Sequence, residues 1–318
     1  LAATILALGL GACAADDPEP PDPDCDAATY GEPAMRADVE YLASPALDGR
    51  VPGTPGDEAA RDLIAERFAC LGLVPLGGAS DYEQPFTDSA GRETANVLGA
   101  LQGDGLTDDL VVLTAHLDHF GDGLLGANDN ASGLSGLLAI AQALAQAGSS
   151  SRTVVFAALG SEESDFDEES AGIEGAEVLM TNPPGDFDPD DVVHNVNLDM
   201  IGTYDVTGIV YALGALPGTA GLAAVEAARS AFPELDVGVG DASDLSDNAA
   251  FCRRGVPYLF FWTEDDACYH EACDTADRID YAGLVAIANL VGDVTLDLAN
   301  APQDLRAAVQ PGADVCGL

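Results

Sequence analysis

The sequence contains no lysine, and its 11 basic residues are all arginine. They stand against 55 acidic residues, which gives a formal net charge of −44 over 318 residues. Such a surface would repel the phosphates of nucleic acids and the head groups of anionic lipids rather than neutralise them. The composition therefore argues against nucleic acid as a partner and against adhesion to anionic membranes. An acidic excess of this size is typical of a protein that is kept soluble by its charge.

Histidine is also scarce, with four residues, and two of them, His116 and His119, stand in one short stretch. Cysteine never occurs with the Cys-x-x-Cys spacing that is typical of thiolate zinc sites. No internal repeat with a period of about 20–50 residues occurs, which argues against a repeat protein. Apolar residues make up 47% of the chain, enough for one large domain with a sizeable core.

The N-terminus looks like a processing signal. Residues 1–10 form an apolar run that is followed by Leu-Gly-Ala-Cys, and together they resemble the end of a bacterial lipoprotein signal with Cys13 as the acylated residue. Because an initiator Met and a basic region are missing, we expect residues 1–12 to be a truncated signal peptide. The run is too short to span a bilayer. An ordinary secretory signal or a buried helix is the alternative, and both secretory interpretations predict an extracytoplasmic protein.

The next segment, residues 13–29, is rich in Pro and Asp and cannot bury enough apolar surface to fold. We expect it to be a semi-extended tether, so that a lipid anchor at Cys13 would be the protein's only link to a membrane. The folded domain is expected over residues 30–300, and residues 301–318 are expected to form a C-terminal tail. The sequence does not indicate the oligomeric state.

Beyond Cys13 the chain has six cysteines, an even number that suggests disulfides in an exported protein. Cys268 and Cys273 are close enough to close a small loop. Cys25 and Cys316 lie at opposite ends of the chain and could tie those ends together. The sequence alone proves neither pairing.

Apolar segments with the pattern of strands alternate with segments of helical spacing. This alternation predicts an α/β fold with three layers, α/β/α, and a mixed, largely parallel central sheet. In such sheets the site lies beyond the carboxyl ends of the strands. We expect strands at residues 96–101, 110–115, 153–159, 192–200, 209–213 and 256–262, and helices at 35–42, 60–71, 132–147, 173–180, 221–232 and 281–300.

Five candidate metal ligands stand in loops at strand ends or before helices. Zinc binds imidazole nitrogen and carboxylate oxygen, and a catalytic zinc site keeps one position open for water. Two zinc ions roughly 3.5–4 Å apart need a bridging carboxylate, and each then needs one imidazole and one further carboxylate. The candidates that meet this demand are His116, Asp129, Glu163, Asp199 and His270.

Two acidic neighbours of these candidates have roles of their own. Asp118, two residues after His116, is placed to orient that imidazole. Glu162 precedes Glu163, and adjacent carboxylates do not easily bind one ion with the same geometry. We therefore assign Glu162 as the general base, which takes a proton from water and later passes it to the leaving amine. Each feature is weak by itself, and their common placement at strand ends is what supports the assignment.

The same motifs resemble those of the M28 family of zinc peptidases, of the aminopeptidase Y and bacterial leucyl aminopeptidase type. The similarity extends over most of residues 38–290. It implies the zinc-dependent exopeptidase fold, two zinc ions as cofactors, and Asp129 as the bridging ligand. The motifs are AHLDHFG with His116, GANDNASG with Asp129, SEE with Glu162 and Glu163, NLDMIG with Asp199, and YHEACDT with His270.

The resemblance also bears on residues outside the ligand set. Tyr269 could stabilise the oxyanion or merely pack its loop. Asn248 stands where the family usually has a histidine, which leaves the ligands unchanged but affects substrate contacts. The acidic insert at residues 164–170 could shape the cleft or be a solvated loop. His119 resembles a position that is not a primary ligand, and His194 stands far ahead of its strand's end, so neither is predicted to bind metal.

The sequence therefore predicts a two-zinc exopeptidase, an aminopeptidase that acts on a peptide or aminoacyl substrate. A carboxypeptidase would favour an arginine that holds the free carboxylate. Arg253 and Arg254 are the candidates near a motif, and they look like surface residues. Glutaminyl cyclase, which resembles the same fold but works with one zinc, is an alternative. A non-catalytic binding lipoprotein is another.

Overall fold

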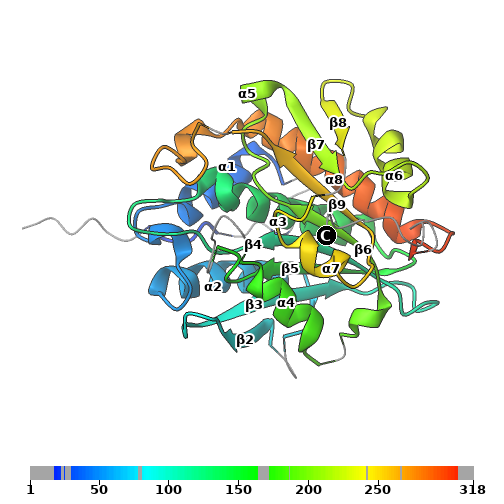
Figure 1. Cartoon of the computed structure of the whole chain (residues 1–318), viewed down its shortest axis with the longest axis horizontal. Coiled ribbons are helices and arrows are strands. Elements are labelled where there is room, and N and C mark those ends of the chain that lie inside the picture. The colour runs from blue at the N-terminus through cyan, green and yellow to red at the C-terminus, as the bar shows by residue number, and fades with distance from the viewer. Residues whose placement is uncertain are drawn as a thin grey trace, which may run out of the picture.

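A mixed β-sheet forms the centre of the fold and carries helices on both faces (Figure 1). The computed structural model describes residues 18–22, 25, 30–77, 81–163, 172–185, 187–240, 243–265 and 267–306. Within these residues nine strands join the sheet in the order β1-β3-β5-β4-β6-β9-β7-β8, with β2 paired to β3. The strands are Val74–Pro75 (β1), Glu83–Thr87 (β2), Glu93–Leu101 (β3), Leu110–His116 (β4), Thr153–Leu159 (β5), Val192–Leu198 (β6), Ile209–Leu213 (β7), Asp236–Gly240 (β8) and Tyr258–Thr263 (β9).

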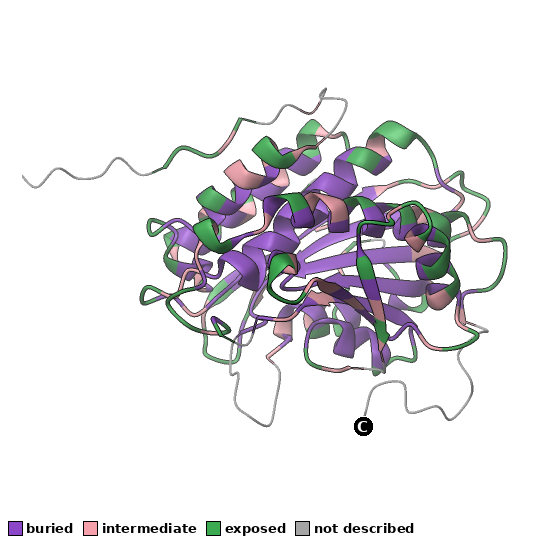
Figure 2. Ribbon diagram, turned by 90° about the horizontal axis from the view of Figure 1, so that it is seen from above, coloured by how far each residue is buried: buried purple, intermediate pink, exposed green. Residues whose placement is uncertain are grey.

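Four neighbouring strands in the middle of the sheet, β5, β4, β6 and β9, run parallel. They are almost wholly buried, as strands covered on both faces are, and Figure 2 draws the sheet mostly in the colour of buried residues. The flanking strands β3 and β7 pair with this group antiparallel. The predicted three-layer α/β/α fold is confirmed, and the carboxyl ends of the four parallel strands meet at one edge.

The helices form two unequal layers. The larger layer packs on one face of the sheet through α1, α2, α3, α6 and α8, and the smaller layer covers the other face through α4 and α7. The last helix, α8, is long and apolar enough to cross a membrane by composition, but most of it is buried in the core. The helices are Glu32–Leu42 (α1), Pro55–Cys70 (α2), Gly133–Ala147 (α3), Glu174–Thr181 (α4), Tyr204–Thr207 (α5), Ala220–Arg229 (α6), Asn248–Cys252 (α7) and Tyr281–Asn300 (α8).

Three strands were not expected from the sequence, and each has a weak pattern. β1 is two residues long, and β2 contains Pro85, which is tolerated at sheet edges but masks a strand pattern. β8 reads Asp-Val-Gly-Val-Gly, and its glycines lower the apparent strand propensity. All three lie toward the edges of the sheet, so the predicted central strands are unaffected.

The pairing of Cys25 with Cys316, which the sequence left open, is contradicted, because Cys25 is bonded to Cys70 at the end of α2. The segment before Cys25 lies against the same helix, where Arg67 Nη2 donates to the carbonyl of Pro21 at 3.1 Å. Part of the predicted tether is therefore fastened to the domain. Cys316 lies outside the described residues.

The expected pairing of Cys268 with Cys273 is confirmed. This disulfide closes a short loop that contains His270. The lipid anchor predicted at Cys13 and the acidic insert predicted at residues 164–170 both lie outside the described residues.

Arg50 is a fully buried residue that ties the loops of the site to α1. Its guanidinium donates to the carbonyl oxygens of Leu117 and Leu42, both at 2.7 Å, of Leu125 at 2.9 Å, and of Gly126 at 3.1 Å. Burial lowers its pKa to about 10, against the opposing pull of nearby carboxylates. Arg50 therefore stays charged at neutral pH and fixes the chain on both sides of the loop that leads to the site.

We expect Arg50→Met to lower the free energy of unfolding by about 3 kcal/mol or more, because it leaves several buried carbonyl groups without a donor. Urea denaturation measures this loss. Arg229→Met is the matched control, since Arg229 makes an exposed ion pair with Glu226 on α6 and should contribute less than about 1 kcal/mol. Equal losses in the two variants would contradict the role given to Arg50.

Candidate metal centre

The five predicted metal ligands come together at the carboxyl edge of the sheet. Three of them stand at the ends of the central parallel strands: His116 is the last residue of β4, Asp199 follows β6, and Glu163 stands in the turn after β5. The other two lie on loops, Asp129 before α3 and His270 after β9. The rule that sites lie beyond the carboxyl ends of strands is thus met.

The first half of the site is built around His116. Its Nε2 lies 3.2 Å from Asp129 Oδ1 and 3.2 Å from Asp199 Oδ1. Its Nδ1 donates to the backbone carbonyl of Asp118 at 3.1 Å, which turns Nε2 toward the two carboxylates. All of these side chains are buried.

The second half is built around His270, whose Nε2 lies 3.3 Å from Asp129 Oδ2 and 3.4 Å from Glu163 Oε2. The two oxygens of Asp129 thus face different imidazoles. Ligand atoms held at 2.0–2.1 Å by a tetrahedral zinc ion are about 3.3 Å apart. The contacts of 3.2–3.4 Å around Asp129 match that separation, so each half could hold one ion. Close groups of possible ligand atoms are also formed by His116, Asp129 and Asp199, and by His119, Asp129 and Glu163.

The electrostatics of the site favour a cation. Burial raises the pKa of Glu162 and of Glu163 well above their usual range, and neighbouring carboxylates such as Asp129 raise both further. Burial would lower the pKa of His116, but contacts with Asp199 and other carboxylates raise it well above its usual value. Carboxylates crowded in this way repel one another, and a metal ion relieves that repulsion. The donor set therefore fits zinc.

The structure corrects how Asp118 acts. Its carboxylate was expected to orient His116, but the backbone carbonyl of Asp118 does so. The carboxylate instead accepts from the backbone N–H groups of Glu162 at 2.8 Å and Glu163 at 3.1 Å. Asp118 therefore fixes the turn that presents both glutamates.

Asp274 fixes the backbone at Asp129 in the way that Asp118 fixes the glutamate turn. It was not predicted as a site residue. It accepts from the backbone N–H groups of Asn128 at 2.7 Å and Asp129 at 3.0 Å. Its signal in the sequence is its place four residues after His270, within the motif that carries that ligand. The partner segment is about 145 residues away, so only the fold could show the contact.

One candidate ligand, His270, and two residues close to other candidate ligands have left-handed backbone conformations. Their φ angles are +58° at Ser161, +54° at Met200 and +55° at His270. Side chains other than glycine seldom adopt this region, and such residues cluster at functional sites. Local backbone strain is thus present at this edge of the sheet.

The remaining two histidines differ in position. His119, left out of the predicted ligand set, is buried in the site with Nδ1 2.9 Å from Glu163 Oε1. His194 lies within β6, and its Nδ1 donates to the carbonyl of Asn195 at 2.8 Å. Burial lowers the pKa of His194 to about 4, so it is a neutral core residue.

A cavity of about 320 Å³ opens onto the ligands. Tyr269 stands at its rim, with its ring stacked on His270 at 3.7 Å between centroids. Asn248 is fully buried instead, with Nδ2 2.6 Å from the carbonyl of Ser243, and is not among the lining residues. The lining combines an acidic floor with an apolar wall, and consists of Asp129, Glu162, Glu163, Asp199, Met200, Leu213, Leu245, Phe260, Trp262, Asp265, Tyr269 and His270.

This arrangement, imidazoles and carboxylates around one aspartate at the edge of an α/β/α sheet, is typical of a metal-dependent enzyme. Residues 96–295, more than half of the chain, match peptidase family M28. The chain belongs to that family.

Solved structures share the fold. A zinc aminopeptidase from Bacillus subtilis is 16% identical, with a TM-score of 0.71 over 88% of this chain and 98% of that one. An aminopeptidase from Aneurinibacillus sp. strain AM-1 is 17% identical, with a TM-score of 0.69 over 87% and 95% of the two chains. Glutaminyl cyclase from Porphyromonas gingivalis is 18% identical, with a TM-score of 0.68 over 83% and 97%.

We expect the Cys268–Cys273 disulfide to hold His270 in place, since it closes the loop on both sides of that residue. Replacing both cysteines with serine should lower zinc affinity by about 10-fold or more, measured by competition with a chelator. Replacing Cys25 and Cys70 with serine is the control and should leave zinc affinity unchanged. If the two double variants bind zinc equally well, the loop does not depend on its disulfide.

Proposed function

We propose that this protein is a two-zinc exopeptidase that acts as an aminopeptidase. The observation that carries the proposal is the division of the Asp129 carboxylate between His116 and His270. One ion would be held by His116, Asp199 and Asp129, and the other by His270, Glu163 and Asp129. Bound zinc polarises a carbonyl group and lowers the pKa of water.

Glu162 is the general base in this proposal. It lines the cavity, is buried, and is held through its backbone N–H by Asp118. Its carboxylate can accept a proton from the attacking water and deliver it to the departing amine. Burial and the neighbouring carboxylates raise the pKa of Tyr269, so its hydroxyl stays protonated and can donate to the developing oxyanion.

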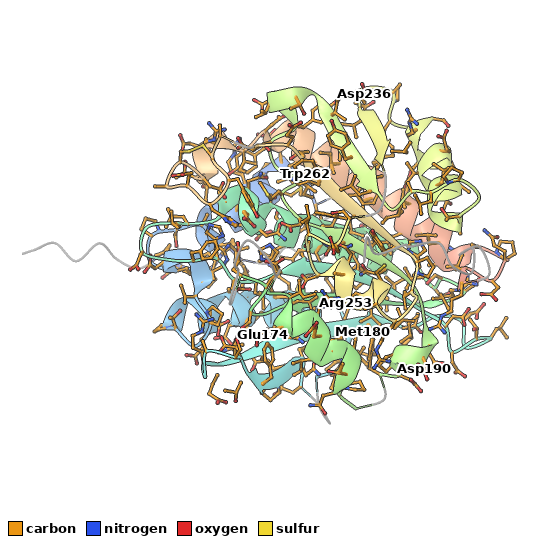
Figure 3. The ribbon with its side chains drawn as sticks, viewed as in Figure 1. Glu174, Met180, Asp190, Asp236, Arg253 and Trp262 are labelled. Carbon is orange, nitrogen blue, oxygen red and sulfur yellow. A yellow bond between two sulfur atoms is a disulfide. The ribbon has the colours of Figure 1, made fainter. Side chains whose placement is uncertain are left out.

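The charges around the cavity support cleavage at the amino terminus of a substrate. Among the described residues that line the cavity, none is an arginine. Arg253 is instead paired with Glu177 of α4 at 2.5 Å, and Figure 3 shows it beside α4 and apart from Trp262 of the cavity. Arg254 lies 3.9 Å from Asp190. An acidic floor suits the ammonium group of a substrate better than a free carboxylate.

The apolar wall supports a large apolar residue at the substrate's amino terminus. Trp262 and Phe260 come from β9, and Leu213 comes from β7. The centroid of the Trp262 ring lies 5.6 Å from that of the Tyr211 ring. Rings and aliphatic groups in a pocket favour apolar side chains through burial. We therefore propose leucyl and aromatic aminoacyl substrates.

Two other functions predict different results. A glutaminyl cyclase would bind one zinc ion tightly and cyclise an N-terminal glutamine, which zinc counting and a glutaminyl substrate would reveal. A non-catalytic binding protein would keep its activity in the cell after Glu162→Gln. Export from the cytoplasm, and the lipid anchor at Cys13, remain predictions.

Glu162→Gln should lower kcat for a leucyl substrate by about 10²–10⁴-fold, because the amide cannot accept the proton from water. Steady-state kinetics measures this change. The variant should keep the parent's zinc content, since Glu162 is not among the proposed ligands. A variant that retains full activity would contradict the role of Glu162 as base.

Trp262→Ala should lower kcat/KM for leucyl and phenylalanyl substrates by about 10-fold or more, because it removes the largest part of the apolar wall. The kcat/KM for an alanyl substrate should fall much less. A panel of aminoacyl substrates measures this selectivity. The control replaces both Arg253 and Arg254 with alanine and should change nothing. Loss of cleavage of peptides with a free carboxyl terminus in that control would contradict the aminopeptidase proposal.

A further inference from the structure

His119 is a buried histidine in the site that the proposed mechanism does not use. It is 1% exposed and follows the β4 ligand His116 by three residues. Its Nδ1 lies 2.9 Å from Glu163 Oε1 and 3.8 Å from Asp129 Oδ2. It thus stands beside the same two carboxylates that His270 contacts.

The distances separate the roles of the two imidazoles. His270 Nε2 is 3.3 and 3.4 Å from its carboxylate oxygens, close to the spacing of about 3.3 Å between ligands of a tetrahedral zinc ion. For His119 the contact with Glu163 has the length of a hydrogen bond, whereas its separation of 3.8 Å from Asp129 is longer than either contact of His270. His119, Asp129 and Glu163 also lie close enough together to form a group that could hold a metal ion. The short contact with Glu163 favours a hydrogen-bond donor, and direct ligation is the alternative that the NMR test below separates.

The carboxylate of Glu163 is divided between these two rings. Oε1 faces His119 and Oε2 faces His270. The backbone N–H of Glu163 is held by Asp118. A hydrogen bond donated to Oε1 therefore restricts the rotation of the Glu163 carboxylate. Oε2 then stays directed toward His270, where the second metal ion would bind.

His119 is itself held on several sides. Its backbone N–H donates to the carbonyl of Gly49 at 2.7 Å, and its ring packs edge-to-face against Phe120 at 5.2 Å between centroids. Gly126, with φ +64°, leaves room for the ring, because a Cβ there would stand 2.6 Å from its Cγ. Within the described residues Nε2 is buried without a hydrogen-bond partner, which suits the tautomer with the proton on Nδ1.

We propose that His119 is a positioning residue that donates from Nδ1 to Glu163 Oε1 and so directs Oε2 to the metal shared with His270. This inference rests on the proposed two-metal function. A parent protein that holds two zinc ions but does not cleave aminoacyl substrates would contradict that function while leaving the role of His119 testable by metal binding alone.

Substitution tests the proposal through zinc binding. In His119→Phe the ring is kept but the donor is lost, and the affinity for the second zinc ion should fall by about 10–100-fold. His119→Asn places an amide N–H near the position of Nδ1 and should restore most of that affinity. His194→Phe is the matched control, a buried histidine outside the site, and should keep both ions at the parent's affinity.

Two results would overturn the proposal. One is a folded His119→Phe variant that binds the second ion as tightly as the parent. The other is a folded His119→Asn variant that is as weak as His119→Phe, since the donated N–H would then be irrelevant.

Direct ligation by His119 is tested by NMR. The protein is labelled with ¹⁵N-histidine and its zinc is replaced by ¹¹³Cd, which couples to the nitrogen atoms that bind it. With only four histidines, the ring signals can be assigned by substitution. We expect coupling at Nε2 of His116 and His270, and a proton on Nδ1 of His119 without coupling. Coupling at His119 would show that it is a ligand and would overturn the proposal.

Discussion

The structure of the site depends on one carboxylate that faces two imidazoles. Asp129 directs Oδ1 to His116 and Oδ2 to His270, although the two histidines are more than 150 residues apart in sequence. That geometry requires a fixed backbone at Asp129, and Asp274 supplies it by accepting the N–H groups there. Arg50 fixes the preceding turn through the carbonyl of Gly126. The surrounding fold thus holds the carboxylate of Asp129 in place between the two imidazoles.

Charge is the second constraint on this edge of the sheet. Several carboxylates are buried within a few ångströms of one another. Burial raises the pKa values of Glu162 and Glu163, and repulsion by neighbouring carboxylates raises them further. Burying such groups without compensation costs several kcal/mol per charge. Arg50 gives partial compensation from beneath the loops, and divalent cations would supply the rest. The same buried carboxylates that would bind the two metal ions therefore also create the repulsion that cations relieve.

The sequence predicted the parts of the site that depend on local order along the chain. Central strands are strongly apolar, so their ends, and with them the candidate ligands His116, Glu163 and Asp199, could be placed from the pattern alone. Contacts between distant segments could not be placed in this way. The partners of the Asp118 and Asp274 carboxylates, the contact of His119 with Glu163, and the Cys25–Cys70 bond all depend on how loops approach one another in space. The edge strands were missed because Pro85 and the glycines of β8 hide their pattern.

Anomalous diffraction from crystals of the zinc-loaded protein, collected on both sides of the zinc absorption edge, tests the central claim most directly. The account predicts two zinc peaks roughly 3.5–4 Å apart, one beside each oxygen of Asp129. The peak near His116 should also contact Asp199, and the peak near His270 should also contact Glu163. A single peak, or two peaks of which only one contacts Asp129, would contradict it.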